Sequence, residues 1–476
     1  MNLDRSSAHY DGDALKKGIK TNRFANAPPG LFFDTDPGFP GRSATNVQWL
    51  NFSPRLGIAW DVNGDGRTSV RASGGTFYDY PAAIYRRDFT TIPPWNPRVQ
   101  LTNVKFDNPW ATYPGGDPFP IPSGPNLPRN IAWTPFSIVT ATDYDAPNMR
   151  VGQWNLSIQK QIGSDWLFSA TYLGNATRHL WTTRPLNNPV FLGLGPCTLN
   201  GVQYPTCSTT ANINQRRRLM LENPVTGQYF GPVHKVETGG TASYNGLLLS
   251  VQRRAARGVT LSGNYTWSHC ISDIWQEVAQ SPNADAGWSD PNNRRFDRGN
   301  CVVSATDRRH LFNLSSVAEV PRFSGAALRA VASGWRFSPI LRIISGGFLS
   351  VTTNQDRALN GMAGQRVNQI IENPYGSKAV NNYLNPNAFA LPALGTLGNM
   401  GRNGILGPGT WQFDMALSRT FQVRESQRME FRAEAFNVTN SLHMNDPVTN
   451  FNSNTFGQVT SAKDPRIMQF ALKYFF

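Results

Sequence analysis

The chain contains 476 residues, and 45 Lys and Arg against 31 Asp and Glu give it a formal net charge of +14. This length fits two globular domains or one large barrel, and a composition with 39% hydrophobic residues, 42 Gly and 34 Pro is unlike that of a helical protein. The basic residues are scattered along the chain, with Arg216–Arg218 the densest run, so we expect no nucleic-acid partner. No run approaches the roughly 18 apolar residues of a membrane-spanning helix.

The first 30 residues are polar and charged, and they lack the apolar segment of a signal peptide. Taken alone, this segment predicts a chain that is not exported. The segments that follow predict the opposite, and a chain that begins inside a larger protein reconciles the two.

From residue 51 onward, segments of about ten residues alternate strictly between apolar and polar side chains, as strands with one apolar face do. In one of them Trp154, Leu156 and Ile158 share a face, and the residues between them are polar. The expected strands cover residues 51–62, 67–78, 150–162, 166–175, 243–254, 259–269, 309–320, 334–345, 411–421, 428–437 and 466–476.

The first two expected strands are joined by Asn63–Gly66, which favours a hairpin turn. The preceding Asp61 completes the opening of a calcium loop, D-x-N-x-D-G. The twelfth position of that loop is Ala72 rather than an acid, and strands flank it rather than helices. We therefore expect a turn here and no metal site.

A soluble β-sandwich also shows alternation, but three features favour a membrane barrel. The segments have the nine to eleven residues of a tilted transmembrane strand. Short turns alternate with long polar connections, as periplasmic turns alternate with extracellular loops. Tryptophans lie near the ends of strands, as in an interfacial girdle: Trp60, Trp166, Trp267, Trp335 and Trp411.

Four cysteines form two local pairs, Cys197 with Cys207 and Cys270 with Cys301, without a CxxC motif or a histidine-rich segment. The pattern favours two disulfides over a zinc site, and it implies an oxidising compartment, although four cysteines allow three connectivities.

One expected strand places Arg428, Glu430, Arg432 and Glu434 on the face opposite purely apolar residues, and Lys473 of the last strand extends this polar face. Such a strand needs water on one side and oil on the other, so these side chains are predicted to line a lumen. Glu430 and Glu434 could also suggest the paired carboxylates of a glycosidase, but the interleaved arginines favour a charge ladder. No HExxH, GxSxG or P-loop motif is present, so we expect neither an enzyme nor a cofactor.

The last strand carries Phe470, Leu472, Tyr474 and Phe476 on one face and ends the chain on an aromatic residue. This ending resembles the signal read by the outer-membrane barrel-assembly machinery, although an ordinary hydrophobic strand is the simpler alternative. The count of about eleven strands is odd, whereas single-chain bacterial barrels have even numbers. Eleven is half of the 22 strands of a plugged outer-membrane transporter.

Several ordered motifs resemble the C-terminal barrel portion of TonB-dependent receptors of the Oar-like type found in acidobacteria. These motifs are Phe52–Trp60, Thr76–Asp79, Tyr244–Leu247, Tyr265–Ser268, Asp307–His310, Tyr383–Pro386, Gly401–Gly404, Phe431–Asn437 and Asp464–Arg466. If the last strand ends in the periplasm, the odd count makes the first strand run the same way, and 1–50 is then expected to be the end of an extracellular loop. The resemblance implies that 51–476 is the C-terminal part of the barrel. It also implies that the signal peptide, the plug, the TonB box and the N-terminal barrel half lie outside this sequence.

The expected architecture is all-β, an antiparallel transmembrane barrel in the cell outer membrane, in contact with its lipid and lipopolysaccharide. The expected function is uptake of an unidentified ligand, such as a carbohydrate or another large nutrient, with energy from TonB through the plug. The alternatives are a passive porin or surface adhesin, and a secreted carbohydrate-binding sandwich. The aromatic segments 93–97 and 108–110 are suited equally to stacking on a ligand and to bracing a loop.

Overall fold

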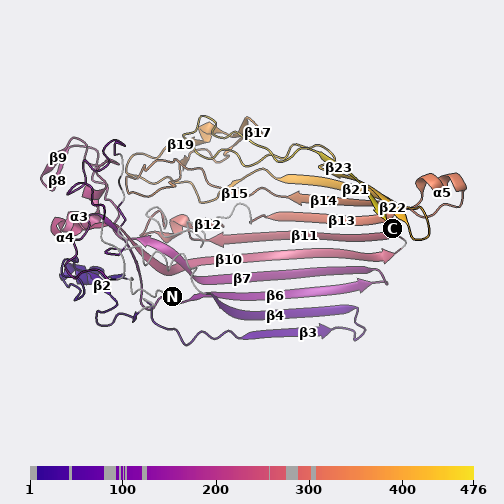
Figure 1. Cartoon of the computed structure of the whole chain (residues 1–476), viewed down its shortest axis with the longest axis horizontal. Coiled ribbons are helices and arrows are strands. Elements are labelled where there is room, and N and C mark those ends of the chain that lie inside the picture. The colour runs from indigo at the N-terminus through magenta and orange to yellow at the C-terminus, as the bar shows by residue number, and fades with distance from the viewer. Residues whose placement is uncertain are drawn as a thin grey trace.

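The computed structural model describes residues 8–41, 45–79, 93–95, 98–99, 101, 104–120, 126–256, 258–274, 288–301 and 307–476. Eleven long strands form one antiparallel sheet in which spatial order follows chain order (Figure 1). They are β3 (Arg55–Asp61), β4 (Thr68–Asp79), β6 (Met149–Ile162), β7 (Trp166–Pro185), β10 (Phe230–Ala256), β11 (Val259–Ser272), β13 (His310–Glu319), β14 (Trp335–Ile344), β21 (Thr410–Gln422), β22 (Arg428–Phe436) and β23 (Ile467–Phe475).

All eleven predicted strands are confirmed, but two of them are much longer than predicted. β7 continues to Pro185 rather than 175, and β10 begins at Phe230 rather than 243. In these extensions β10 pairs on one side with β7 and on the other, in parallel, with β5 (Ser137–Thr142). Both predicted strands stop where the apolar alternation ends, although strand pairing continues beyond it.

The two ends of the sheet differ in their connections. At one end, which we call the turn end, β6 joins β7 through 163–165 and β21 joins β22 through 423–427, and α5 (Ala326–Ala332) lies between β13 and β14. At the opposite loop end, connections such as 186–229 and 345–409 are long, and they carry almost all the short elements (Figure 1).

The first turn forms as the hairpin that its sequence predicts. Gly64 and Gly66 both have φ of +71°, a conformation that costs glycine little. The Asp61 carboxylate accepts the Gly66 N–H at 2.7 Å, and the Asp65 carboxylate accepts the Arg67 N–H at 2.9 Å. Both acids of the calcium-like motif therefore hold the turn itself.

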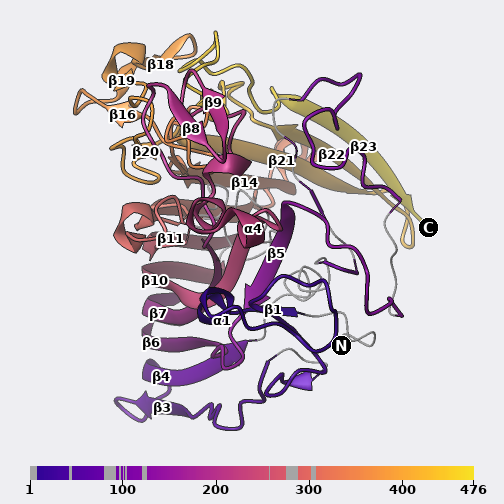
Figure 2. The ribbon, with the colours of Figure 1, turned by 90° about the vertical axis from the view of Figure 1, so that its left-hand side faces the viewer.

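Viewed from the loop end, the strands form an open arc whose edges are β3 and β23, with β1 and β5 on its concave side (Figure 2). The sheet is not closed among the described residues. The prediction of a 22-stranded barrel therefore stays a prediction.

The hydrophobic cores of the described chain lie among the connections at the loop end, which we call the loop layer. One core packs β1 (Ala8–Tyr10), α1 (Gly12–Lys16) and β2 (Leu31–Phe33) against Trp95 and Phe230. The segment predicted to be the end of a loop is thus built into this layer. The second core is formed by connections after β14 and β22 and contains Val351, Val367, Tyr383, Leu384, Ala388, Phe389, Met400, Ile405, Phe456 and Val459.

Short elements complete the loop layer. They are β8 (Cys197–Leu199), β9 (Val202–Tyr204), α3 (Arg218–Glu222), α4 (Pro224–Gly227), β12 (Gly299–Asn300), β15 (Phe348–Leu349), β16 (Asn368–Gln369), β17 (Tyr375–Ala379), β18 (Asn382–Leu384), β19 (Phe389–Ala390) and β20 (Ile405–Leu406), with 3-10 turns at Asn214–Arg216, Arg294–Asp297 and Pro386–Ala388. In the part of the chain that the structure describes, no helix has the length and apolar character needed to cross a membrane.

Gly174 provides a test of how tightly the sheet is packed. It lies opposite Trp154, and a Cβ added at Gly174 would come within 2.6 Å of the Trp154 ring. Gly174→Ala should therefore displace the ring and lower the free energy of unfolding by about 1–3 kcal/mol, measured by denaturant titration in detergent micelles. Gly152→Ala is the matched control, because the nearest heavy atom to its added Cβ is 3.9 Å away. Equal losses in both variants would contradict this packing.

Candidate functional surfaces

The sheet has one continuous apolar face, set by the strand register. In one row across five strands, Ile158, Ala170, Leu249, Tyr265 and Phe312 are successive partners. Many large apolar side chains of this face are exposed: Leu56, Ile58, Trp60, Trp154, Leu156, Ile158, Ile162, Phe168, Tyr172, Leu249, Trp267, Phe337, Ile343, Trp411, Met468, Phe470, Leu472 and Tyr474. An apolar surface that extends over eleven strands far exceeds the patches of a few hundred Å² on soluble monomers.

The five tryptophans singled out in the sequence all lie on this apolar face. Trp60, Trp166 and Trp335 lie at the turn end, and Trp267 and Trp411 lie towards the loop end. Trp411 is the partner of Ile343, eight residues along β14 from Trp335. At roughly 3.3 Å per residue the two belts are about 26 Å apart along the strand, close to the height of the apolar band of an outer-membrane barrel.

The opposite face of the sheet is polar and is linked by side-chain hydrogen bonds. The Asn313 amide donates to Asn264 at 3.0 Å, and the Arg342 guanidinium donates to Asn313 at 3.2 Å. Hydroxyl pairs such as Ser169 with Ser250, at 2.6 Å, join further strands. The eleven-stranded sheet, which we call the wall, is therefore suited to separate an apolar environment from an aqueous one.

The predicted charge ladder lies on the polar face. Glu430 is the cross-strand partner of Lys473, and Arg432 contacts Glu434 at 2.5 Å. The Arg428 guanidinium lies over the Phe475 ring at 4.9 Å. The structure thus brings the five predicted residues together at the β22–β23 edge.

The predicted assembly signal lies on the apolar face of β23. Phe470, Leu472 and Tyr474 are all more than half exposed, and Phe476 follows the strand with 96% of its surface exposed. β23 is also an edge of the described sheet. Its terminal aromatic residues are therefore accessible.

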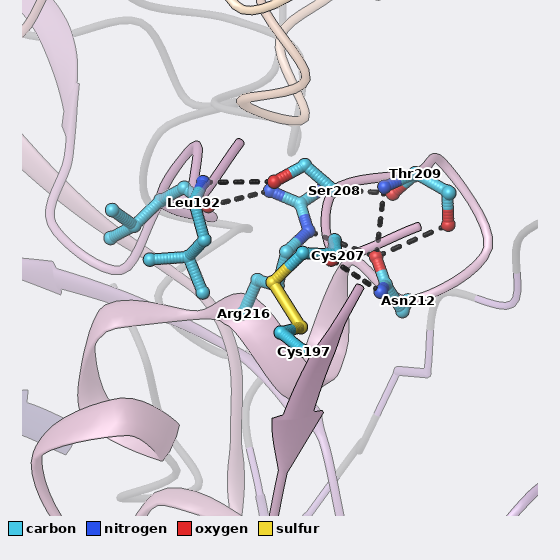
Figure 3. The surroundings of a disulfide bond; sticks show 8 residues. Leu192, Cys197, Cys207, Ser208, Thr209, Asn212 and Arg216 are labelled. Carbon is cyan, nitrogen blue, oxygen red and sulfur yellow. Dashed lines mark hydrogen bonds between the residues drawn. A yellow bond between two sulfur atoms is a disulfide. The ribbon is translucent and has the colours of Figure 1, made fainter. Parts of the chain in front are cut away.

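Both local cysteine pairs are disulfide-bonded in the structure, Cys197 to Cys207 and Cys270 to Cys301. Figure 3 shows Arg216 beside the first bond, with its Nε donating to the Asn212 side chain at 2.9 Å. The fully buried Arg216 guanidinium also donates to the carbonyls of Val190, Thr209 and Leu359. It therefore ties the connection after β7 to the connection after β14.

A second buried cluster, which was not predicted from the sequence, joins the connection after β11 to the same connection after β14. The Asp297 carboxylate accepts from Arg366 at 2.8 Å and from the Ser289 N–H at 2.6 Å. Arg402 donates to the Asp297 carbonyl at 2.8 Å and to Ser272 at 3.0 Å. Asp297 and Arg366 are almost completely buried, so this ion pair is shielded from solvent.

His234 is buried in the part of β10 that precedes the predicted strand 243–254. Burial, with a further contribution from Arg217 and Arg98, lowers the pKa of His234 to about 3. Its Nδ1 atom has no hydrogen-bond partner. Burial and the adjacent Arg216 likewise lower the pKa of Arg217 to about 9.

A hollow of about 360 Å³ with a largely polar lining lies in the loop layer. It is lined by His9, Tyr10, Asp11, Gly12, Asp13, Leu15, Lys16, Ala141, Asp143, Arg184, Leu186, Arg218, Leu219, Glu222 and Lys235. Within it Lys235 contacts Asp143 at 2.8 Å, and burial raises the pKa of Tyr10 to about 12. Charges of both signs face this space, so it suits a polar ligand with donors and acceptors.

The described residues cover the aromatic loop segments in part. Trp95 is buried between Phe24 and Phe33 and therefore braces the first core. Trp110 packs against Tyr113 and Phe119. Asn96 and Pro97 lie outside the described residues. Among the residues that are described, no group of three or more His, Cys, Asp and Glu side chains could hold a metal ion.

The family described as "Outer membrane beta barrel domain" matches residues 6–469 of the chain. No curated protein sequence matches it. Among solved structures, the chain is similar to the outer membrane transporter YddB from Escherichia coli, with 11% identity and a TM-score of 0.46, over 89% of this chain and 40% of that one. It is also similar to the ferripyoverdine receptor of Pseudomonas aeruginosa, with 10% identity and a TM-score of 0.38, over 89% of this chain and 32% of that one. A third similar structure is the siderophore receptor PirA from Acinetobacter baumannii, with 10% identity and a TM-score of 0.39, over 89% of this chain and 41% of that one. The chain spans less than half of each.

The buried ion pair should be far more important for stability than an exposed one. Arg366→Met leaves the Asp297 carboxylate buried without its cation, so we expect a loss of about 3–5 kcal/mol and faster proteolysis of the loop layer. Arg336→Gln is the control, because Arg336 and Glu319 are both about half exposed and their pair contributes about 1 kcal/mol or less. A smaller loss in Arg366→Met than in the control would refute the role of the buried pair.

His234 should make the loop layer sensitive to acid. In the unfolded chain the pKa of histidine is about 6.5, so between pH 6.5 and 3 the unfolded state binds a proton that folded His234 does not. The free energy of unfolding should therefore decrease as the pH is lowered from 6.5 to 3, by up to about 1.4 kcal/mol per pH unit. Proteolysis of the loops at graded pH measures this, and His234→Asn should flatten the dependence. An unchanged slope in the variant would assign the effect to other groups.

Proposed function

Because the chain belongs to the outer membrane beta-barrel domain family and is a protein of the cell outer membrane, we propose that it forms the C-terminal wall of a TonB-dependent receptor of the Oar-like type. The observation that carries this proposal is the pair of opposed faces. An exposed apolar face bounded by two tryptophan belts suits lipid, and a hydrogen-bonded polar face suits a water-filled or plugged lumen.

The direction of the edge strands restricts what can complete the barrel. β3 and β23 run the same way, because the sheet has eleven antiparallel strands in chain order. A complement with an odd number of strands, whose two edge strands run opposite to β3 and β23, closes the barrel with antiparallel pairs at both seams. A second copy of this sheet inserted in the same orientation also has eleven strands, but its edges run parallel to β3 and β23 and would create parallel seams. An N-terminal half of eleven strands meets this requirement and gives 22 in total. Closure is needed because unpaired strand edges are costly in lipid.

The polar face would then contact a plug. The ladder of Arg428, Glu430, Arg432 and Glu434 offers solvated charges that can release and re-form contacts as the plug moves, and these pairs individually contribute little stability. TonB would act through the plug rather than on this wall. The ligand would enter through the loop layer, where the mixed-charge hollow suits a carbohydrate or another polar nutrient.

A passive porin or adhesin barrel is the alternative, and coupling to TonB separates the two. Ligand uptake through the receptor should stop in cells without TonB and return when TonB is restored. Uptake that is unchanged without TonB would identify a passive channel. No uptake in either strain, with surface binding retained, would identify an adhesin.

The orientation of the wall can be tested with single cysteines, because all four native cysteines are disulfide-bonded. Asn381→Cys lies in the β17–β18 connection at the loop end, and Glu425→Cys lies in the β21–β22 turn. A membrane-impermeant maleimide should label Asn381→Cys on intact cells, and it should label Glu425→Cys only after the outer membrane is permeabilised. Labelling of Glu425→Cys on intact cells would reverse the orientation or exclude membrane insertion.

The terminal aromatic residue should matter for assembly more than its neighbour. Phe476→Ser should lower the amount of chain recovered in the outer membrane several-fold if the assembly machinery reads the apolar face of β23. Phe475→Ser is the control, because Phe475 lies on the polar face opposite Arg428. Equal recovery of the two variants would mean that Phe476 is simply the end of a hydrophobic strand.

A further inference from the structure

A groove of about 530 Å³ lies within the apolar face, across five neighbouring strands. Its apolar lining comes chiefly from Ile158, Phe168, Ala170, Leu249, Val251, Gly263, Tyr265, Phe312 and Leu314, and Lys160 closes one part of it. The register places these residues in two adjacent rows of the same face.

Small residues form the floor of the groove. Ala170 and Gly263 lie where their neighbours carry large side chains, and a Cβ at Gly263 would lie 3.2 Å from Leu314 and 3.3 Å from Val251. Aromatic side chains of Phe168, Tyr265 and Phe312 surround this floor. An open hollow with an almost wholly apolar lining matches the chemistry of an acyl chain.

Two cations lie on the apolar face at the end of the groove nearest the turns. Lys160 is the partner of Phe168, and Arg253 is the partner of Trp166 one row nearer the turns. The Arg253 guanidinium lies over the Trp166 ring at 5.5 Å, and its buried Nε has no hydrogen-bond partner. Neither cation pairs with a carboxylate in the described parts of the chain.

The contrast with Arg419 shows that these cations differ from an ordinary interfacial arginine. Arg419 also lies on the apolar face at the turn end, over Trp335. Its guanidinium, however, donates to the carbonyls of Val331 and Ala330 beside α5. Arg419 therefore has hydrogen-bond partners within the chain, whereas the side chains of Lys160 and Arg253 have neither a hydrogen-bond partner nor a carboxylate partner among the described residues.

We propose that this groove binds one anionic phospholipid from the leaflet at the turn end, with its phosphate between Lys160 and Arg253 and an acyl chain over Ala170 and Gly263. The two cations are on strands two apart, roughly 10 Å, a spacing that a headgroup phosphate can bridge with long flexible side chains. The anion offsets the cost of holding unpaired cations near lipid. This inference rests on the proposed assignment of the apolar face to lipid.

The test uses the full chain extracted from outer membranes in mild detergent. Native mass spectrometry counts the lipids retained after addition of phosphatidylglycerol or phosphatidylcholine in equal amounts. The wild-type chain should retain one phosphatidylglycerol, with a preference of about tenfold or more over phosphatidylcholine. The Lys160→Gln/Arg253→Gln variant should lose the preference, and Gly263→Leu, which fills the groove, should lower retention of both lipids.

Arg419→Gln is the matched control and should retain phosphatidylglycerol like the wild type. The proposal would be overturned by any of three results. These are equal retention of both lipids by the wild type, an undiminished preference in the double variant, and retention of lipopolysaccharide in place of phosphatidylglycerol. Outer-membrane fractionation of every variant distinguishes a failure of membrane insertion from a failure of lipid binding. A wild-type chain absent from that fraction contradicts the proposed function, whereas an inserted chain without lipid preference contradicts only the lipid site.

Discussion

Hydrogen bonding between adjacent strands determines most of this structure. A strand in lipid has no water to satisfy its backbone N–H and C=O groups, so these groups must form hydrogen bonds with a neighbouring strand. Once that pairing is made, side chains alternate between the two faces, and the register decides which residues share a row. The apolar face, the polar face, the tryptophan belts and the charge ladder all follow from this single pattern.

The loop layer obeys different physics from the wall. The wall leaves its large apolar side chains exposed, whereas the loops bury theirs in two cores, one around Phe24, Phe33 and Trp95 and the other around Val351 and Met400. Buried charges then connect the loops to one another, through Arg216 in one place and through Asp297 with Arg366 in another. The loop layer is therefore folded as a soluble domain folds, although it is supported on a sheet that is built for lipid.

The sequence predicts the wall well, because alternation is a local signal repeated eleven times. It does not predict the extension of β7 and β10, since the pairing of β10 with β5 depends on a segment about 90 residues earlier in the chain. The cluster of Asp297 and Arg366 is hidden for the same reason, because the two residues are 69 positions apart and neither lies in a motif. The cysteine pairs are visible in the sequence because each pair is close in the chain, with separations of 10 and 31 residues.

The uneven lengths of the connections also bear on the order in which the sheet can form. Closing a short connection costs less chain entropy than closing a long one, so the strands flanking each turn are expected to meet first. This gives five hairpins, β3–β4, β6–β7, β10–β11, β13–β14 and β21–β22, which then join across the long loops. Among the described strands β23 is not joined to a neighbour by a short turn, and it reaches β22 only across residues 437–466. Of these eleven strands β23 is thus the one whose docking is kinetically least favoured, so a catalyst of assembly that holds this strand would accelerate sheet formation most.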